Sequence, residues 1–198
     1  MNTIIDNDLL SIQEARILAE NAREAQKILA TFPQEKLDGI VDRMAEEIGK
    51  YARELAVMSS EETDYGLWQD KYIKNRFVCE YLREKLRGLR CVGIIARDEV
   101  NKTMDVGVPL GVIASLCPAT SPASTTIYKV LIAIKSGNAI IVSPHPRAQK
   151  TISRVADYYM KVHGICADQS VRFDVVAFDG EEMELIRDAF AYAGNVRF

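Results

Sequence analysis

The sequence predicts an α/β protein in which several N-terminal helices are followed by a small unit of parallel strands. Two observations lead to this fold class. Apolar residues recur at helical spacing through the N-terminal part of the chain. Two short, continuously apolar runs at 112–116 and 139–142 then flank a helical segment, as in buried parallel strands joined by a crossover helix.

Length and composition are those of an ordinary globular protein, with 198 residues of which 48% are apolar and 27% charged. The formal net charge of −3 provides no field for holding nucleic acid or an anionic membrane, so neither partner is expected. The 2 histidines and the lack of any CxxC pair argue against a metal site. No signal peptide or membrane-spanning run is recognised, and we expect a cytoplasmic protein.

Three helical segments are expected before the strands. The first covers 10–31 and begins at a capping box formed by Ser11 and Glu14. The second carries a single apolar stripe over 37–55, and the third lies within 63–89. The apolar residues of the third segment that we expect in the core are Tyr72, Phe77, Val78, Tyr81 and Leu82.

Short β-rich runs follow from residue 91, and then comes the strand–helix–strand unit. A helix at 123–136 joins its two strands and ends at Gly137, which favours the left-handed backbone of a helix C-terminus. The carboxyl ends of parallel strands meet at one edge of a sheet. We therefore expect the loops at 118–121 and 143–146 to lie at the same edge.

The remaining residues are expected to form a helix at 150–162, a strand at 171–178 and a last helix at 181–193. The strand at 171–178 is a candidate to cover an open edge of the sheet. We therefore divide the chain into a part at 1–148 and a helix–strand–helix tail at 149–198, whose origin is uncertain.

Residues 108–148 contain, in order, the motifs P-x-G-V-I, P-x-T-x-P-x-S-T, G-N-A-I-I and S-P-H-P-R-A. The segment closely resembles the acylating, CoA-dependent branch of the aldehyde dehydrogenase superfamily, and the resemblance extends over about 10–148. It implies an incomplete Rossmann-like unit that binds NAD or NADP. In that family a cysteine thiolate of a second domain attacks the aldehyde, and the resulting thioester is released to CoA.

Carried onto this sequence, the resemblance implies that five residues at the two strand ends line an adenosine pocket. These candidate cofactor-binding residues are Pro118, Thr120, Ser143, His145 and Pro146. The alternative interpretation is that they are turn residues that only end the strands. Ser121 occupies the position of the family's oxyanion-stabilising Asn, and its shorter side chain reaches less far.

No catalytic residue is assigned, because the family's nucleophile belongs to a region that these 198 residues do not match. Cys79, Cys91, Cys117 and Cys166 all lie outside the nucleophile motif. Cys117, beside the expected cofactor site, is either a substitute nucleophile or a small buried side chain, and we favour the second interpretation.

A weaker resemblance joins about 150–192 to the C-terminal end of a small endonuclease-like family. Asp174 and Asp179 would be its nearest carboxylates, but a strand position and a turn position explain them better than a metal site does.

Three functions remain open. The chain is an NAD(P)-dependent aldehyde dehydrogenase of the acetaldehyde or sulfoacetaldehyde type, truncated and inactive by itself. Alternatively, it is a non-catalytic nucleotide-binding protein or a partner of a full-length paralogue. The third interpretation is a non-functional fusion of two gene fragments. A homo-oligomer is compatible with the first two.

Overall fold

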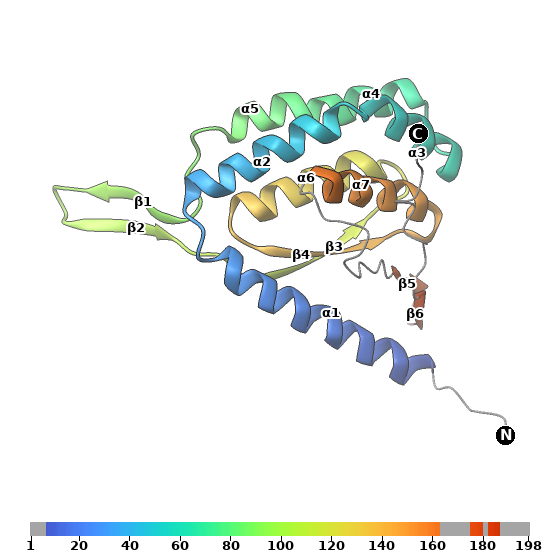
Figure 1. The fold of residues 1–198 in the computed structure, drawn as a ribbon, viewed down its shortest axis with the longest axis horizontal. Coiled ribbons are helices and arrows are strands. Elements are labelled where there is room, and N and C mark those ends of the chain that lie inside the picture. Colours follow the sequence, from blue (N-terminus) through green and yellow to red (C-terminus); the bar gives the residue numbers. More distant parts are fainter. Residues whose placement is uncertain (1–6, 163–174, 180–181, 187–198) are drawn as a thin grey trace.

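The computed structural model describes residues 7–162, 175–179 and 182–186. Helices and strands follow one another in the order expected of an α/β protein, which confirms the predicted fold class (Figure 1). The elements are α1 (Asn7–Leu29), α2 (Gln34–Gly49), α3 (Ala52–Thr63), α4 (Trp68–Arg76), the π-helix η1 (Phe77–Leu82), α5 (Arg83–Leu86), β1 (Gly93–Asp98), β2 (Thr103–Gly107), β3 (Val112–Cys117), α6 (Pro122–Lys135), β4 (Ala139–Pro144), the 3₁₀ turn η2 (Pro146–Ala148), α7 (Gln149–Val162), β5 (Val175–Asp179) and β6 (Glu182–Ile186).

The first helix was predicted correctly, but its capping box was not. Helix α1 already includes Asn7, so Ser11 and Glu14 lie inside the helix rather than at its start. Both side chains are buried. A hydroxyl caps only the free N–H groups of a first turn, and those groups belong to earlier residues here.

The second predicted helix is divided into α2 and α3. The helix stops after Gly49, and Tyr51 leaves helical geometry with φ of −102° and ψ of 9°. The ring of Tyr51 stacks on Tyr158 of α7 with the centroids 3.6 Å apart. The apolar stripe is buried on both sides of this break, as predicted; its fully buried members include Leu37, Met44, Ile48 and Leu55.

The third predicted helix runs continuously through α4, η1 and α5, but its π-helical part changes which residues face inward. Phe77 and Tyr81, which we expected in the core, are each 53% exposed and stack on each other. Val78 is buried as expected, and Cys79, which was not expected in the core, is buried as well. A π-helical turn contains more residues than an α-helical turn, so the buried face shifts around the axis.

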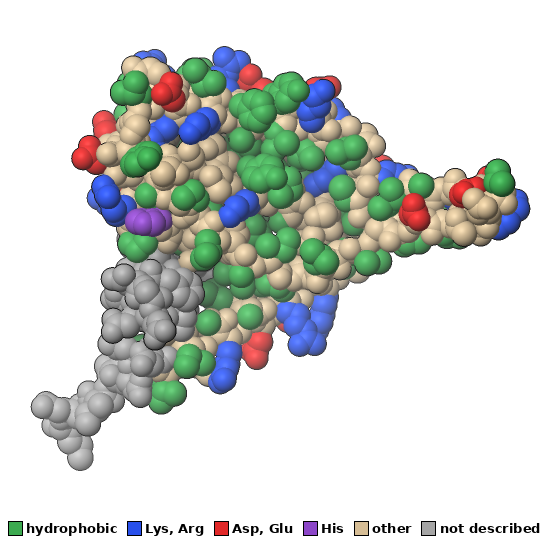
Figure 2. All heavy atoms as spheres, turned by 180° about the vertical axis from the view of Figure 1, so that it is seen from behind, with side chains coloured by type: hydrophobic (Ala, Val, Ile, Leu, Met, Phe, Trp, Pro, Cys, Tyr) green, Lys and Arg blue, Asp and Glu red, His purple; other side chains and the backbone are tan. Residues whose placement is uncertain are grey.

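Strands β1 and β2 form an antiparallel hairpin that projects from the rest of the molecule (Figure 1). Its tip is held by the Asp98 carboxylate, which accepts hydrogen bonds from the backbone N–H groups of Val100 and Asn101. These bonds lower the pKa of Asp98. Figure 2 shows hydrophobic side chains exposed along this hairpin, and Val100 is 90% exposed.

Strands β3 and β4 are parallel and are joined by α6, as predicted. The predicted burial of β3 is wrong, because Leu116 is 64% exposed and only Ser115 and Cys117 of this strand are buried. Asn138 fixes their register, because its side chain accepts a hydrogen bond of 2.9 Å from the N–H of Gly111, just before β3. Gly137 has the expected positive φ, at 71°. Helices α6 and α7 lie on one side of the two strands in Figure 1, and α1 lies on the other.

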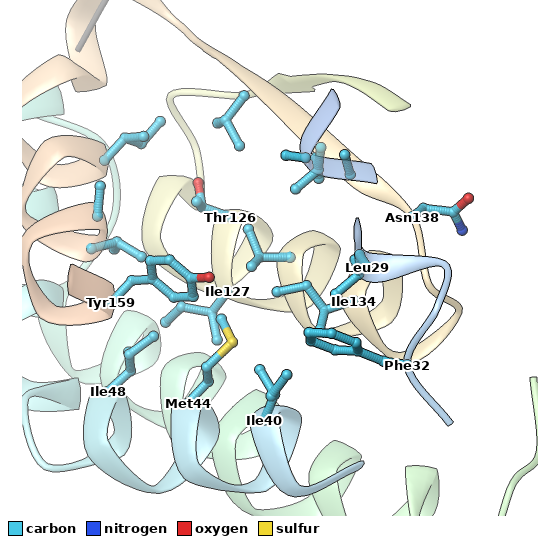
Figure 3. Close-up of a pocket in the computed structure, with 18 residues that line it drawn as sticks. Leu29, Phe32, Ile40, Met44, Ile48, Thr126, Ile127, Ile134, Asn138 and Tyr159 are labelled. Atoms are coloured by element: carbon cyan, nitrogen blue, oxygen red, sulfur yellow. The ribbon is translucent and has the colours of Figure 1, made fainter. Parts of the chain in front are cut away.

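A largely apolar cavity of about 540 Å³ lies among α1, α2, α6, α7 and β4. Figure 3 shows side chains of α2, α6 and α7 pointing into it, among them Met44, Ile127 and Tyr159. Helix α7, which we assigned to the tail, packs on α2, α3 and α6. The division of the chain at residue 148 stays a prediction.

The end of the described chain differs from the prediction. Residues 182–186, expected in a helix, form β6, which pairs with β5 in an antiparallel hairpin of its own. Cross-strand pairing therefore overrides the helix propensity of a segment rich in Glu, Met and Leu. Strand β5 pairs with neither β3 nor β4, so it does not extend their sheet. Of the helices described, none is long and apolar enough to span a bilayer.

One buried side chain joins the helices to the hairpin and to the crossover helix. The amide nitrogen of Gln34 donates to Asp38 at 2.7 Å and to the carbonyl of Lys135 at 3.2 Å. Its oxygen accepts from the N–H groups of Cys91 and Val92 at 2.7 and 3.0 Å. Lys135, which is buried, also pairs with Asp38 at 2.6 Å. The start of α2, the end of α6 and the start of the hairpin therefore meet at one carboxamide.

Replacing Gln34 with Ala should lower the free energy of unfolding by about 2–4 kcal/mol, because four hydrogen bonds are lost and their partners are partly buried. Urea denaturation measures this loss. The control is Glu35→Ala at the neighbouring position, which removes only an exposed ion pair with Arg90 and should cost about 0–1 kcal/mol. Equal losses for the two variants would contradict the role given to Gln34.

Candidate functional site

The loops that follow β3 and β4 lie at the same edge of the sheet, which confirms the predicted geometry. The two strands are in parallel register up to the pair Cys117 and Pro144. Directly beyond it, the N–H of His145 donates to the carbonyl of Cys117 at 3.0 Å. The loop at 118–121 and the loop at 143–146 are therefore neighbours at the carboxyl ends of the strands.

The five predicted cofactor-binding residues are all accessible at this edge. Ser143 is half-buried, and the other four, Pro118, Thr120, His145 and Pro146, are exposed. They lie apart from the 540 Å³ cavity, which other residues line. Their proximity follows from the strand register, while their role in binding a nucleotide stays a prediction.

The loop after β4 is fixed by groups from α3. The Glu62 carboxylate accepts hydrogen bonds from the N–H groups of Lys150 and Thr151, at 2.6 and 2.7 Å, and from the Thr151 hydroxyl at 2.6 Å. Arg147 donates to the carbonyl of Thr63 at 2.7 Å. A carboxylate at a helix N-terminus accepts hydrogen bonds from the free N–H groups of the first turn, and its negative charge interacts favourably with the positive end of the helix dipole. Glu62 therefore occupies the N-terminus of α7 with a carboxylate.

The loop after β3 is held by two lysines of α4 that the sequence analysis did not identify. Lys71 donates to the carbonyl of Thr120 at 2.9 Å and to the Ser59 hydroxyl at 3.1 Å. Lys74 donates to the Ser121 hydroxyl oxygen at 3.1 Å. Both ammonium groups thus contact consecutive residues of the turn. The sequence could have indicated a role for Lys71, because this residue falls on the inward face of a predicted helix. A buried charge there needs a polar partner.

Lys71 is an unusual cation because it is only 5% exposed. Burial lowers its pKa, and the positive charge of Lys74 lowers it further. Among the residues that the structure describes, its Nζ contacts a hydroxyl and a carbonyl and makes no ion pair. The turn at 120–121 consequently carries positive charge that no carboxylate of the described chain neutralises.

Two of the described cysteines, Cys79 and Cys117, are poorly suited to nucleophilic attack. Cys79 is buried, and its burial raises the pKa of the thiol to about 12, so the thiolate is scarce at neutral pH. Cys117 is also buried, and its sulfur accepts a hydrogen bond from the Thr126 hydroxyl at 3.3 Å. Cys91 is half-buried. The small-buried-residue interpretation of Cys117 therefore fits its surroundings.

Two of the residues considered at the sequence level lie outside the described part, namely Cys166 and Asp174. Asp179 ends β5.

The sequence matches the aldehyde dehydrogenase family over residues 3–167. It is 35% identical over 151 residues to the bifunctional aldehyde-alcohol dehydrogenase AdhE of Escherichia coli K12, covering 76% of this chain and 17% of that protein. It is 32% identical over 176 residues to the acylating sulfoacetaldehyde dehydrogenase of Cupriavidus necator, covering 84% of this chain and 35% of that protein.

Solved structures show the same similarity. An acetylating aldehyde dehydrogenase from Geobacillus thermoglucosidasius superimposes with a TM-score of 0.76 and 40% identity, over 84% of this chain and 37% of that one. An engineered glycolyl-CoA reductase with bound NADP⁺ superimposes with a TM-score of 0.65 and 25% identity, over 74% of this chain and 33% of that one.

The chain spans 17% and 35% of the lengths of these two relatives, so the activity of a whole relative is not thereby an activity of this chain. None of these matches supports the endonuclease-like resemblance of residues 150–192.

Cys79 should be alkylated by iodoacetamide at least about tenfold more slowly than Cys91 in the folded protein, because Cys79 is buried and its pKa is raised. Peptide mass spectrometry after timed quenching at pH 8 measures both rates. In concentrated urea the two thiols should react at similar rates, which serves as the control. A native Cys79 that reacts as fast as Cys91 would show that the helix around it opens readily.

Proposed function

The chain belongs to the aldehyde dehydrogenase family, and from this premise we propose that the carboxyl edge of β3 and β4 binds NAD or NADP. The support is the position of the two predicted loops, which meet beyond the pair Cys117 and Pro144. In open α/β sheets, nucleotides bind outside the carboxyl ends of parallel strands. The bound NADP⁺ in one similar structure agrees with this class of cofactor.

The residues present at this edge suit a nucleotide. Pro118 and Pro146 offer flat apolar surfaces, and the imidazole of His145 is exposed beside them. The exposed side chain of Thr120 places a hydroxyl at the same edge. Because the Glu62 carboxylate occupies the N-terminus of α7, we propose that the phosphates lie away from that helix end. When bound, NAD(P) would supply hydride acceptance.

We also propose that the chain belongs functionally to the acylating branch, with CoA as co-substrate and an aldehyde of the acetaldehyde or sulfoacetaldehyde type. The relative from Cupriavidus necator and the structure from Geobacillus thermoglucosidasius carry the names of acylating and acetylating enzymes. The P-x-T-x-P-x-S-T turn at 118–125 is the part of this chain on which the assignment rests.

Nucleotide binding should raise the melting temperature. At a hundredfold excess of nucleotide over its Kd, the stabilisation is about 2.7 kcal/mol. Thr120→Phe places a bulky ring on the exposed strand end and should weaken NAD⁺ or NADP⁺ binding at least tenfold. Differential scanning fluorimetry with each nucleotide tests both expectations.

The matched control is Val100→Phe, which adds the same ring at the exposed hairpin tip. It should leave the nucleotide-dependent shift unchanged. No shift for the unaltered protein at millimolar NAD⁺ and NADP⁺ would contradict the proposed function. A shift that Thr120→Phe preserves would place the nucleotide elsewhere.

We propose further that these 198 residues do not oxidise aldehydes by themselves. Among the described residues, no base is hydrogen-bonded to buried Cys79 or Cys117. By the resemblance, Ser121 stands where the family has Asn. An oxyanion-hole donor is worth about 3–4 kcal/mol of activation free energy. A nucleotide-binding pseudoenzyme, or a partner of a full-length paralogue, is the alternative that these observations favour. A non-functional gene fusion remains the third interpretation.

NADH formation from acetaldehyde, CoA and NAD⁺, followed at 340 nm, should stay at the background without protein. A full-length acylating aldehyde dehydrogenase provides the positive control. Turnover that Cys117→Ala abolishes would overturn both the proposed inactivity and the structural interpretation of Cys117.

We propose that the projecting hairpin is the surface through which the chain associates, in a homo-oligomer or with a full-length paralogue. Its exposed apolar side chains include Ile95, Met104 and Val106. A two-stranded ribbon is marginally stable in water unless another surface covers it. We also propose that the protein is cytoplasmic.

A further inference from the structure

The cavity among α1, α2, α6, α7 and β4 has the size and the lining of a ligand pocket (Figure 3). Its volume is about 540 Å³, and among the described residues that line it none is charged. Ligand pockets in proteins commonly have volumes of about 300–1,000 Å³ and mainly apolar walls. The proposed nucleotide site at the carboxyl edge of β3 and β4 lies apart from this cavity, and its residues do not line it.

The few polar groups in the lining are neutral or already bonded. The Thr126 hydroxyl donates to the sulfur of Cys117 at 3.3 Å, and the Asn138 side chain accepts from the N–H of Gly111 at 2.9 Å. Burial raises the pKa of Tyr159, so its hydroxyl stays protonated. A buried water needs two to four polar partners. The interior therefore favours an apolar ligand over water.

The cavity reaches the surface between the end of α1 and the start of α2. Along α2 the lining residues become more buried, since Ile40 is half-buried whereas Met44 and Ile48 are only 1% and 2% exposed. On α1, Ala25 is exposed and Leu29 is half-buried. The deep part of the cavity thus lies toward Ile48, and its mouth lies near Ile40.

Lys36 places a positive charge at this mouth. It precedes Ile40 by one helical turn, so it extends the row of α2 residues, spaced four apart, that line the cavity. Its ammonium lies 3.3 Å from the centre of the Phe32 ring, and Phe32 is itself part of the lining. The cation and the cavity wall therefore share one aromatic ring.

The charge of Lys36 has no carboxylate partner within the part of the chain that the structure describes. Other lysines on the neighbouring helices differ in this respect. Lys27 of α1 pairs with Glu24 at 2.6 Å, and Lys135 of α6 pairs with Asp38 at 2.6 Å. Lys36 is exposed and contacts an aromatic face instead. An anion from solution can therefore approach it.

We propose that this cavity binds a medium-chain fatty acid, with the alkyl chain in the interior and the carboxylate beside Lys36. A dry cavity of about 150 Å³ binds benzene, so one of about 540 Å³ has room for a chain of about eight to twelve carbons. The chain leaves water, while the carboxylate remains at the surface. No cysteine, histidine or carboxylate is among the described lining residues, so the ligand is bound and not converted.

The test is binding of octanoate to the purified chain without nucleotide, followed by the methyl signals of ¹³C-labelled isoleucines. The signals of Ile48 and Ile127, which line the cavity, should shift. Those of Ile73 and Ile95, which are exposed elsewhere, should not. Calorimetric affinities should rise about tenfold from hexanoate to octanoate and again to decanoate, since each step buries two more CH₂ groups. Beyond about twelve carbons the increase should stop.

A substitution at the mouth tests the place of the chain. Ala25→Phe puts a ring at an exposed lining position of α1 and should weaken octanoate binding at least about fivefold. The matched control is Ala19→Phe, which adds the same ring at an exposed position of α1 outside the lining. It should leave the affinity unchanged. Melting temperatures check that both variants fold.

A second substitution tests the charge. Lys36→Gln should weaken octanoate binding about two- to fivefold and leave the binding of 1-octanol, which is neutral, unchanged. Lys36→Arg keeps the charge and should retain the affinity for octanoate. The matched control is Lys85→Gln, which removes another exposed lysine that lies over an aromatic ring, that of Tyr81. It should change neither affinity.

Absence of octanoate binding, or shifts confined to isoleucines outside the cavity, would overturn the proposal. Binding that Ala25→Phe leaves intact would overturn it as well. Equal effects of Lys36→Gln on octanoate and 1-octanol would refute the role of Lys36. Because nucleotide is absent from every sample, failure here is independent of whether NAD(P) binds at the edge of β3 and β4.

Discussion

The parallel pairing of β3 and β4 is the constraint on which the rest of this structure depends. Two parallel neighbours cannot be joined by a tight turn, so the chain must cross over through α6. The crossover places one helix layer against the strands and brings both carboxyl ends to one edge. Asn138 holds the register by bonding to Gly111. A shift of one residue in the pairing of β3 with β4 would turn the side chains of the shifted strand to the opposite face of the sheet.

Around this pair, polar side chains determine how the helices meet it. Gln34 ties α2 to the end of α6 and to the start of the hairpin, while Glu62 and Arg147 tie α3 to the loop after β4. Buried polar atoms are costly unless bonded, so each contact tolerates few alternative arrangements. Burial of the apolar core stabilises the packed state, and these hydrogen bonds determine how the helices are arranged in it.

The edge that carries the candidate site is asymmetric in charge. A carboxylate occupies the helix end after β4, whereas two lysines contact the turn after β3. The loop after β3 is therefore contacted by positive charge, and the loop after β4 by negative charge. Since the desolvation of Lys71 opposes folding, the protein keeps a charge there at a cost in stability.

The amino-acid sequence by itself determined the fold class, the parallel strand pair, the shared edge of the two loops and the family. These follow from local periodicity, from Pro and Gly at strand and helix ends, and from motifs with constant spacing. The tertiary structure alone decided the break before Tyr51, the exposure of Phe77, the strand at 182–186 and the contacts of Lys71 and Lys74. Each of these depends on groups distant in sequence. A ring of α7 stacks on Tyr51, and a strand partner overrides helix propensity. The carbonyl that Lys71 binds lies 49 positions away, and no local pattern encodes such a separation.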